Sequence, residues 1–315
     1  MAAKRVTMKD VARASGVSAS TVSFVLNDAP GQTIPDATRE RVRRAAAELG
    51  YVPHGLARAL REGSSRIVVL NVARLPRDGV ALAGFIGGLS DELAEHGHTL
   101  LVRYRDAPDD ADPVLAAISP RAVLDLDRVY FDDEPELADG GWVDGLAAHT
   151  AVQLRHLVGA GHRSIAFALR GDERLSRLGA LRFDYARDAA AEAGLPALVP
   201  VAVGHPAAAH DRDALAALLA EHPEITAVAG VDDEAAMRVL AAARALGLAV
   251  PDRLAVIGFD ETPFAELAEP PLTTVRIDTA AFGRRAAREL LGLPAATDDR
   301  GSASLAATVI RRESA

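Results

Sequence analysis

The chain has 315 residues, of which 49% are hydrophobic and 25% charged, and it contains no cysteine. This length predicts two or three domains. The lack of cysteine excludes a disulfide framework and a thiolate metal site, and it favours a reducing compartment. Residues 1–9 lack the apolar segment of a signal peptide, and no apolar run approaches the ~20 residues of a membrane span. We therefore expect a cytoplasmic protein with no membrane partner.

Charge is distributed unevenly along the chain. Residues 1–63 contain ten Lys/Arg and six Asp/Glu, a net charge of +4, whereas the remaining 25 basic and 38 acidic residues give −13. A basic head on an acidic body is typical of a polyanion-binding module attached to a part that should not bind nucleic acid.

The first helix is predicted to begin at Thr7, which is followed three residues later by Asp10 in the pattern of a capping box. Val11 and Ala14 are expected on its apolar face, and Gly16 is expected to end it. The head therefore starts with a short helix and a tight turn.

A second helix follows, with Ser18 as its expected cap. Val22, Val25 and Leu26 form an apolar stripe at spacings of three and four. Ala12, Gly16 and Val22 also place a small residue, a glycine and a branched residue at successive spacings of four and six. Together these features predict a helix-turn-helix.

A third helix is predicted from about Pro35 and Asp36 to a stop at Gly50. Its inward residues are expected to be Val42, Ala45, Ala46 and Leu49, and its outer face carries Arg39, Arg41, Arg43 and Arg44. Any three-helix bundle could show such a pattern, with the arginines merely solvating a surface. DNA binding is favoured because the motif, the local positive charge and the terminal position agree.

Several stretches resemble one known family. They are T-M-K-D-V-A-R-A-S-G-V-S-A-S-T-V-S-F-V-L-N-D, T-R-E-R-V and E-L-G-Y-V-P-H-G-L-A-R-A-L-R in the head, and V-P-D-R-L-A-V-I-G-F-D and P-P-L-T-T-V in the body. The chain thereby resembles, along essentially its whole length, the lactose-repressor and purine-repressor (LacI/GalR) family of bacterial transcription regulators.

The resemblance implies two kinds of DNA contact, to phosphates and to bases. Hydroxyl, amide and phenol groups fix the register on phosphates, and variable positions of the second helix contact bases. The expected phosphate contacts are Ser18, Thr21, Ser23, Asn27, Thr38 and Tyr51, the base contacts are Ala19, Ser20 and Phe24, and Thr7 belongs to the same DNA-binding set.

Phe24 departs from the arginine that is frequent at this position of the family. A guanidinium can contact guanine through two hydrogen bonds, whereas a phenyl ring offers only apolar contact, for instance to a thymine methyl group. The alternative is that Phe24 packs in the core of the head, although Val22, Val25 and Leu26 already occupy the inward face.

Residues 53–61 are predicted to form a short hinge helix, which is too short to be stable alone. The resemblance implies that it orders when two subunits meet on DNA, with Leu60 wedged into the minor groove and Arg58 available to phosphate. The alternative is a plain linker with an incidental leucine.

From residue 66 onward strands and helices alternate. Strands are expected at 66–70, 99–102, 164–167 and 198–201, with helices at 85–96 and 183–193. Such alternation predicts parallel doubly wound sheets in two similar lobes, with a ligand site between them at the strand carboxyl ends. The expected fold class is an all-α helix-turn-helix head plus an α/β two-lobed core, similar to periplasmic binding proteins.

These patterns also predict the domain organisation. The head would be 1–50 and the hinge and linker 51–65. The core would be 66–315, with an N-lobe of about 66–143 plus 276–304 and a C-lobe of about 144–275 plus 305–315. The resemblance places the crossings between lobes near Val143, Val275 and Leu305.

By family position, Arg182, Asp232 and Asp260 are expected to point into an effector pocket, as a donor fork and two acceptors. Each has a plainer alternative: Arg182 could form a salt bridge at a helix start, and Asp232 and Asp233 could cap the helix that runs to Leu246.

Three features depart from the family pattern at this pocket. Asp232 stands where asparagine is common, 79–82 replaces an aromatic segment, and 106–143 is short by about one strand-helix unit. With 4% aromatic residues, few rings are available to stack on a sugar. A sugar is a candidate effector. The alternative is that the pocket is reduced or lost.

No pattern of catalysis is present, and no catalytic residue, metal ligand or cofactor is predicted. Gly159-Ala-Gly161 follows a predicted helix and precedes a strand, the reverse of a phosphate-binding turn. His96 and His98 lack a third ligand nearby. A solute-binding protein of the same architecture would need a signal peptide and no helix-turn-helix.

We therefore predict a transcription regulator rather than an enzyme. It would be a repressor that binds a pseudo-palindromic, double-stranded operator as a homodimer and responds to a small-molecule effector in the cleft. The alternative is a DNA-binding protein whose core only dimerises and binds no ligand.

Overall fold

The computed structural model describes residues 6–26, 32–51, 64–73, 75, 79–104, 112–131, 140–171, 176–204, 208–294 and 307–315. The chain divides into two compact units, residues 1–65 and 66–315, which we call the head and the core and describe separately. Asn27, Arg58, Leu60, the expected hinge at 53–61 and the crossing near Leu305 lie outside the described residues. None of the helices described is long and apolar enough to cross a membrane.

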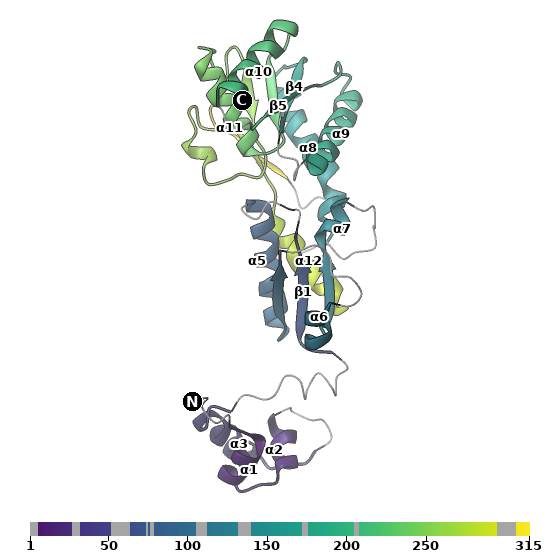
Figure 1. Ribbon diagram of the computed structural model, residues 1–315, viewed down its shortest axis with the longest axis vertical. Coiled ribbons are helices and arrows are strands. Elements are labelled where there is room, and N and C mark those ends of the chain that lie inside the picture. The colour runs from purple at the N-terminus through teal and green to yellow at the C-terminus, as the bar shows by residue number, and fades with distance from the viewer. Residues whose placement is uncertain are drawn as a thin grey trace. The chain divides into compact units, whose positions relative to one another are not determined.

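The head contains three helices, α1 (Met8–Ser15), α2 (Ala19–Leu26) and α3 (Asp36–Glu48) (Figure 1). The predicted capping box of α1 is confirmed: the Asp10 carboxylate accepts hydrogen bonds from the Thr7 amide at 2.9 Å and from the Thr7 hydroxyl at 2.6 Å. Gly16 ends α1 in a left-handed conformation with φ 67°. Local sequence therefore fixes the start of the first helix and the turn that follows it.

Two residues of the head lie elsewhere than predicted. Ala14 is exposed, and Ser15 is buried instead, with its hydroxyl donating to the Val11 carbonyl at 2.7 Å. Position 15 lies nearer than position 14 to the direction of Val11, since helical residues advance about 100° each. Leu49 is also exposed because α3 ends before it, and Tyr51 joins the core as its amide donates to the Ala46 carbonyl at 2.8 Å.

The N-lobe of the core contains a parallel sheet with strand order β2-β1-β3. Its strands are β1 (Ile67–Asn71), β2 (Thr99–Arg103) and β3 (Ala122–Asp125), and its helices are α5 (Val80–Glu95), α6 (Pro113–Ile118), α7 (Leu126–Phe131) and α12 (Thr279–Leu291). Helix α12 packs along α5 beside β1 (Figure 1). Phe85, Leu89 and Phe282 are fully buried between them.

The C-lobe contains a second parallel sheet, with strand order β5-β4-β6-β7. Its strands are β4 (Ile165–Arg170), β5 (Val199–Val203), β6 (Ala227–Gly230) and β7 (Ala255–Ile257), and its elements outside the sheet are α8 (Trp142–Gly159), α9 (Ser176–Glu192), α10 (Ala208–Glu221), α11 (Asp233–Ala245) and η1 (Ala265–Leu267). The predicted parallel α/β architecture is thus confirmed in both lobes.

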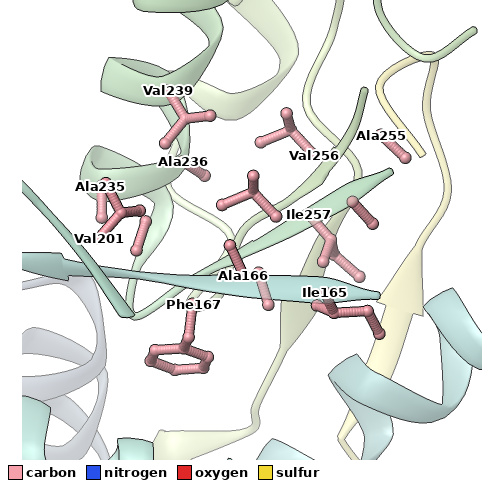
Figure 2. Packing of buried hydrophobic residues seen from close by; sticks show 14 of the residues in the cluster. Ile165, Ala166, Phe167, Val201, Ala235, Ala236, Val239, Ala255, Val256 and Ile257 are labelled. Atoms are coloured by element: carbon pink, nitrogen blue, oxygen red, sulfur yellow. The ribbon is translucent and has the colours of Figure 1, made fainter. Parts of the chain in front are cut away.

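The strands of the C-lobe are apolar on both faces because helices cover both. Figure 2 shows Ile165 and Phe167 of β4, Val256 and Ile257 of β7, and residues of α11 such as Val239 in one packed cluster. Continuous apolar runs are the expected pattern of buried parallel strands. The segment I-A-F-A of β4 therefore shows no alternation of polar and apolar residues, and it nevertheless forms a central strand of the sheet.

Two helices begin earlier than predicted. Helix α5 begins at Val80 rather than 85, and α9 begins at Ser176 rather than 183. Gly79 is the N-cap of α5 and makes no side-chain cap hydrogen bond, so no capping signature marked the start. Among the described residues, the segment between β2 and α8 supplies a single strand, β3.

Helix α8 contributes to the cores of both lobes. Trp142 and Leu146 belong to the N-lobe core, and Leu154 and Leu157 belong to the C-lobe core. The chain returns through β8 (Thr274–Arg276), which pairs antiparallel with β9 (Thr308–Ile310). The lobes are therefore joined by a continuous helix as well as by extended segments.

Candidate DNA-binding surface and effector pocket

Helix α2 presents the expected base-contacting residues. Ser20 and Phe24, one helical turn apart, are exposed, and Ala19 is half-buried. Phe24 retains 37% exposure, so the prediction that it could pack in the core is wrong. Val22 and Val25 fill the core from the opposite side of the helix. A phenyl group therefore lies on the outer surface of the predicted recognition helix.

Hydroxyl groups gather at the start of α2. The Ser18 hydroxyl accepts the Thr21 amide hydrogen bond at 3.0 Å and lies 2.9 Å from the Thr21 hydroxyl, which confirms Ser18 as the cap. Thr7 is exposed, and Ser23 and Thr38 are half-buried. Tyr51 is only 9% exposed, so its ring belongs to the core of the head.

The arginines of α3 do not form one uniform solvated face. Arg41 donates through Nε to the Ser15 carbonyl at 2.9 Å, at the end of α1. Arg39 donates to the Ile34 carbonyl at 3.3 Å. Both thus brace the chain of the head, and Arg41 does so although it is exposed, as are Arg43 and Arg44. Sequence alone could not predict the contacts of Arg39 and Arg41, because these contacts depend on the tertiary fold.

The core contains a pocket of about 770 Å³, counting its open mouth. Its charged lining comprises the three predicted residues Arg182, Asp232 and Asp260 together with Arg170. The other lining residues are apolar: Leu75, Gly79, Ala81, Leu82, Trp142, Leu146, Leu178, Gly179, Val231, Phe259 and Ile277. The structure therefore brings together all three residues that the sequence nominated for effector binding.

Three of the charged residues lie at carboxyl ends of adjacent strands. Arg170 is the last residue of β4, Asp232 follows β6, and Asp260 follows β7. These strands are neighbours in the sheet, so their ends converge on one edge. This is the edge at which open α/β sheets bind ligands.

Arg182 lies within α9, 3% exposed, rather than at a helix start as one alternative supposed. It donates to the Val231 carbonyl, and a second donor lies 3.4 Å from Oε1 of Gln153. Its guanidinium carbon lies 3.4 Å from the centre of the Phe259 ring, a cation–π contact. These contacts hold the guanidinium in place at the pocket wall.

Asp232 performs both roles that the sequence left open. One carboxylate oxygen caps α11 by accepting the Ala235 amide at 2.7 Å, and the other lies 3.3 Å from Nη1 of Arg170. The charge that distinguishes Asp232 from the asparagine common in the family is therefore balanced by Arg170. Sequence reasoning missed Arg170, although its position three residues after the strand predicted at 164–167 could have indicated it.

Asp233 does not cap the helix, so that alternative is wrong. Its carboxylate is buried, where it accepts the Thr274 hydroxyl at 2.5 Å and the Thr262 amide at 2.6 Å. Burial raises the pKa of this carboxyl, although these hydrogen bonds act in the opposite direction. Asp233 thus fastens the start of α11 to the segments that follow β7.

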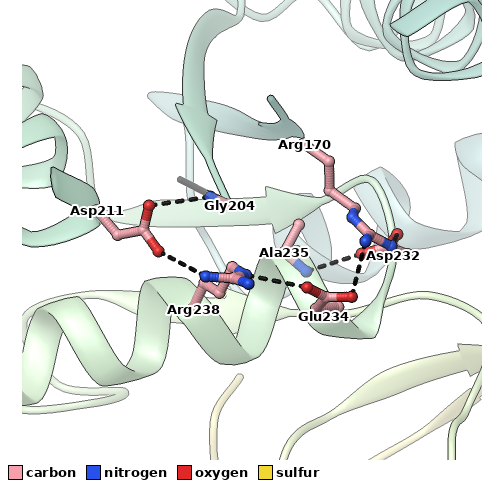
Figure 3. Close-up of polar contacts among 7 residues, drawn as sticks. All are labelled: Arg170, Gly204, Asp211, Asp232, Glu234, Ala235 and Arg238. Atoms are coloured by element: carbon pink, nitrogen blue, oxygen red, sulfur yellow. Dashed lines mark hydrogen bonds and ion pairs between the residues drawn. The ribbon is translucent and has the colours of Figure 1, made fainter. Parts of the chain in front are cut away.

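Arg170 belongs to a series of ion pairs of alternating sign (Figure 3). Its Nη2 lies 2.9 Å from Glu234, which lies 3.1 Å from Nε of Arg238. Arg238 in turn lies 3.2 Å from Asp211, whose other oxygen accepts the Gly204 amide at 2.9 Å. The series extends from the pocket wall to the loop after β5 and fixes the direction of the Arg170 side chain.

Asp260 is the acceptor of the pocket with the most unusual environment. Its φ is 95°, a left-handed value that aspartate tolerates better than most residues, and its amide donates to the Val275 carbonyl at 2.9 Å. Burial raises the pKa of its carboxyl to about 7, with Arg182 lowering it and Asp232 and Asp233 raising it further. No hydrogen bond from any described residue reaches this carboxylate.

Trp142 is a second lining residue that sequence reasoning missed. It is the only tryptophan of the chain, and its ring stacks on Phe85 with centroids 5.1 Å apart and planes at 22°. The replaced segment at 79–82 also lines the pocket, through Gly79, Ala81 and Leu82. Among the described residues, no cluster of three or more His, Asp or Glu could hold a metal ion.

A helix-turn-helix head carried by a two-lobed α/β core with a pocket at its strand ends defines a class of protein, the DNA-binding regulator with an effector-type core. Residues 7–54 match the family described as bacterial regulatory proteins, lacI family, and residues 154–315 match the periplasmic binding protein-like domain. The chain belongs to the lacI family of bacterial regulatory proteins, whose members are transcriptional regulators and not enzymes.

Relatives and solved structures agree along most of the chain. The HTH-type transcriptional regulator GalS of Salmonella typhimurium is 30% identical, covering 98% of this chain and 96% of the relative. The HTH-type transcriptional repressor PurR of Vibrio campbellii is 30% identical, covering 90% and 91%. The lac repressor dimer bound to operator and the anti-inducer ONPF has a TM-score of 0.72 at 22% identity, covering 99% of both chains. The predicted family, fold class and function as a DNA-binding transcription regulator are confirmed.

Proposed function

We propose that this regulator acts in the cytoplasm as a homodimeric repressor that binds a pseudo-palindromic operator and is controlled by a small molecule in the core pocket. The observation that carries the proposal is the convergence of Arg170, Arg182, Asp232 and Asp260 on one cavity in a chain that also carries a helix-turn-helix. A relative of the chain is named as a repressor, and a similar structure is a dimer on its operator.

On the DNA side, the exposed residues of α2 support the assignment of Ala19, Ser20 and Phe24 to base contacts. The hydroxyls of Ser18 and Thr21 at the start of α2 support phosphate contacts, since a helix N-terminus and its hydroxyls favour an anion. Thr7, Ser23, Asn27, Thr38, Tyr51, Arg58 and Leu60 complete the proposed DNA-binding set.

On the effector side, the pocket argues against a core that serves only for dimerisation. A charged arginine is buried at its wall, and a carboxyl with a raised pKa lies at its strand ends, both of which cost stability. Such costs are common where a protein retains a binding site. A solved structure of a transcriptional regulator CelR in complex with cellobiose, with a TM-score of 0.51 at 24% identity, supports a sugar as one candidate.

The test is selection and sequencing of random DNA fragments by the full-length protein at about physiological salt, where non-specific phosphate binding is weak. We expect enrichment of a two-fold symmetric site. Enrichment of an asymmetric half-site alone would contradict the dimer, and no enrichment with or without a metabolite extract would contradict sequence-specific binding.

The variant Phe24→Arg tests the position of the recognition helix in the same selection. We expect its enriched site to differ from that of the wild type at one base pair of each half-site, towards guanine, because a guanidinium can bind guanine through two hydrogen bonds. Ser20→Ala is the matched control on the same helix face. An unchanged site for Phe24→Arg would show that this residue does not contact a base.

A further inference from the structure

The two walls of the pocket differ in chemistry. All four charged lining residues come from the C-lobe, namely Arg170, Arg182, Asp232 and Asp260. The N-lobe contributes Leu75, Leu82, Trp142 and Leu146 among others, and it contributes no charged lining residue from the part of the chain that the structure describes. Among the described lining residues, a ligand in this pocket therefore faces charged groups on one side and hydrocarbon on the other.

The N-lobe does possess polar groups at the carboxyl ends of its strands. Asn71, Arg103 and Asp125 end the three neighbouring strands in register, and all three are buried. Arg103 pairs with Asp112 at 2.5 Å, and Asn71 donates to Asp125 at 3.4 Å. None of them lines the pocket. Oδ1 of Asn71 and Nη1 of Arg103 are buried without a hydrogen-bond partner among the described residues, but these side chains are not part of the pocket lining.

The apolar wall is also held rigidly. Trp142 stacks on Phe85, which is fully buried, and Leu82 and Leu146 are each 4% exposed within the same core. These side chains cannot turn away to admit water or a polar partner without opening the N-lobe core. A polyol placed against this wall would leave hydroxyl groups unpaired, which is costly in a buried site.

On the polar wall, most charged groups are already paired. Arg170 is held by Asp232 and Glu234, and Arg182 donates to the Val231 carbonyl. Asp260 differs, because no hydrogen bond from a described residue reaches its carboxylate. Arg182 acts on this carboxylate through its charge, so among the described residues the group that this wall lacks is a hydrogen-bond donor at Asp260.

From these contacts, and resting on the proposed role of the pocket as the effector site, we propose that the effector is an amphipathic small molecule with an apolar body and a single polar end. The body, of about the size of an aromatic ring, packs against the leucines and Trp142 of the N-lobe. The polar end carries a hydrogen-bond donor, either a hydroxyl or an amine, that binds Asp260.

Binding of four probes to the full-length protein tests the proposal, by calorimetry and by the shift in melting temperature. Phenyl β-D-glucopyranoside against D-glucose isolates the apolar body. Comparing 2-phenylethylamine with 3-phenylpropanoate shows whether the polar end must be a hydrogen-bond donor or an acceptor. We expect the first member of at least one pair to bind, and to bind about tenfold or more tightly than its partner. The pair that binds shows whether the donor of the polar end is a hydroxyl or an amine.

Two variants assign the binding to the two walls. Leu178→Gln changes a half-buried lining residue that packs against the N-lobe core, so we expect weaker binding of the aromatic probe and no change for glucose. Asp260→Asn removes the carboxylate charge in a residue that also tolerates positive φ, so we expect loss of the donor preference. Melting curves without ligand show whether each variant folds.

Equal binding of glucose and its phenyl glycoside, tighter binding of the carboxylate probe, or no binding by any probe would each overturn the proposal. Selection of an operator by the same preparation separates this result from the proposed function. Specific DNA binding with no probe bound refutes the amphipathic effector alone, whereas loss of specific DNA binding counts against the regulator itself.

Discussion

At the scale of single residues, the neighbouring carboxyl groups of Asp260 and Glu261 have pKa values shifted in opposite directions, upwards for Asp260 and downwards for Glu261. Asp260 is desolvated beside two other aspartates, whereas Glu261 accepts hydrogen bonds from Arg276, the largest effect on its pKa, and from Arg312. Adjacent residues thus have opposite linkage between pH and folding stability.

We predict that Asp260→Asn becomes stabilising relative to the wild type as the pH rises from about 4 to about 7. The pKa of this carboxyl is about 7 in the folded chain against an ordinary value of 3.8, so the folded state binds more protons in this window and the wild type loses stability as they dissociate. Chemical denaturation at several pH values measures the difference. A difference that does not vary with pH would contradict the raised pKa.

Glu261→Gln provides the control of opposite sign. Because the pKa of Glu261 is lowered, its ionised form stabilises the fold at neutral pH, and that stabilisation is lost as the pH falls through the folded pKa. We expect the variant to be less stable than the wild type at pH 7 and to approach it in acid.

Arg182, Asp232 and Asp260 were all indicated by resemblance to the family. The structure adds a physical reason for two of them, because Asp232 and Asp260 follow β6 and β7 at the edge where an α/β sheet places ligands. Trp142 could not be indicated in this way, because its place depends on where α8 begins and on its stacking with Phe85.

At the scale of elements, the contact between α5 and α12 depends on glycine. A Cβ atom on Gly283 would lie 2.1 Å from the Phe85 carbonyl oxygen and 2.6 Å from the Leu89 amide nitrogen. A Cβ atom on Gly88 would lie 1.9 Å from the Ala280 carbonyl oxygen. The two helix backbones therefore approach each other at points that admit no side chain.

We predict that Gly283→Ala destabilises the core by about 3 kcal/mol, because backbone cannot yield as a flexible side chain can. Gly87→Ala is the matched control on α5, since a Cβ there meets nothing within 4 Å, and helix propensity favours alanine by about 1 kcal/mol. Urea denaturation of both variants measures the free energy of unfolding. Similar effects of the two substitutions would show that the close approach is absent.

The alternation of strands and helices and the existence of α5 were predictable, whereas α12 was not among the predicted helices, and helix limits were predicted less well. Alternating strands and helices follow from composition and period, and the parallel sheets follow from the alternation. The start of α5 at Val80 lacks a side-chain cap, and Leu49 of the head was placed inside although α3 ends before it. Both errors concern helix ends, where tertiary contacts outweigh local preference.

At the scale of the whole molecule, the head and the core have separate hydrophobic cores. The head buries Val11, Val22, Val25, Val42 and neighbours in one cluster, and residues 66–315 contain two further clusters. Charge divides at nearly the same boundary, with a basic head and an acidic body. The difference in charge between the two parts therefore indicated two units, each of which is stabilised by its own hydrophobic core.

We predict that Val22→Ala weakens operator binding while leaving the stability of the core unchanged. The substitution removes fully buried methyl groups from the small core of the head, at a cost of roughly 2 kcal/mol. Trp142 is the only tryptophan and lies in the N-lobe, so its fluorescence reports unfolding of the core alone. A shift of that fluorescence transition would contradict the independence of the two units.

Helix α8 has a consequence for any motion between the lobes. Its 18 residues span about 27 Å, and its two ends are packed into different cores. A helix can bend or rotate about its axis, but its hydrogen bonds run along that axis and resist extension. The lobes can therefore change their mutual angle while their separation along α8 stays fixed. The pocket would open by rotation about an axis close to Trp142 and Leu146.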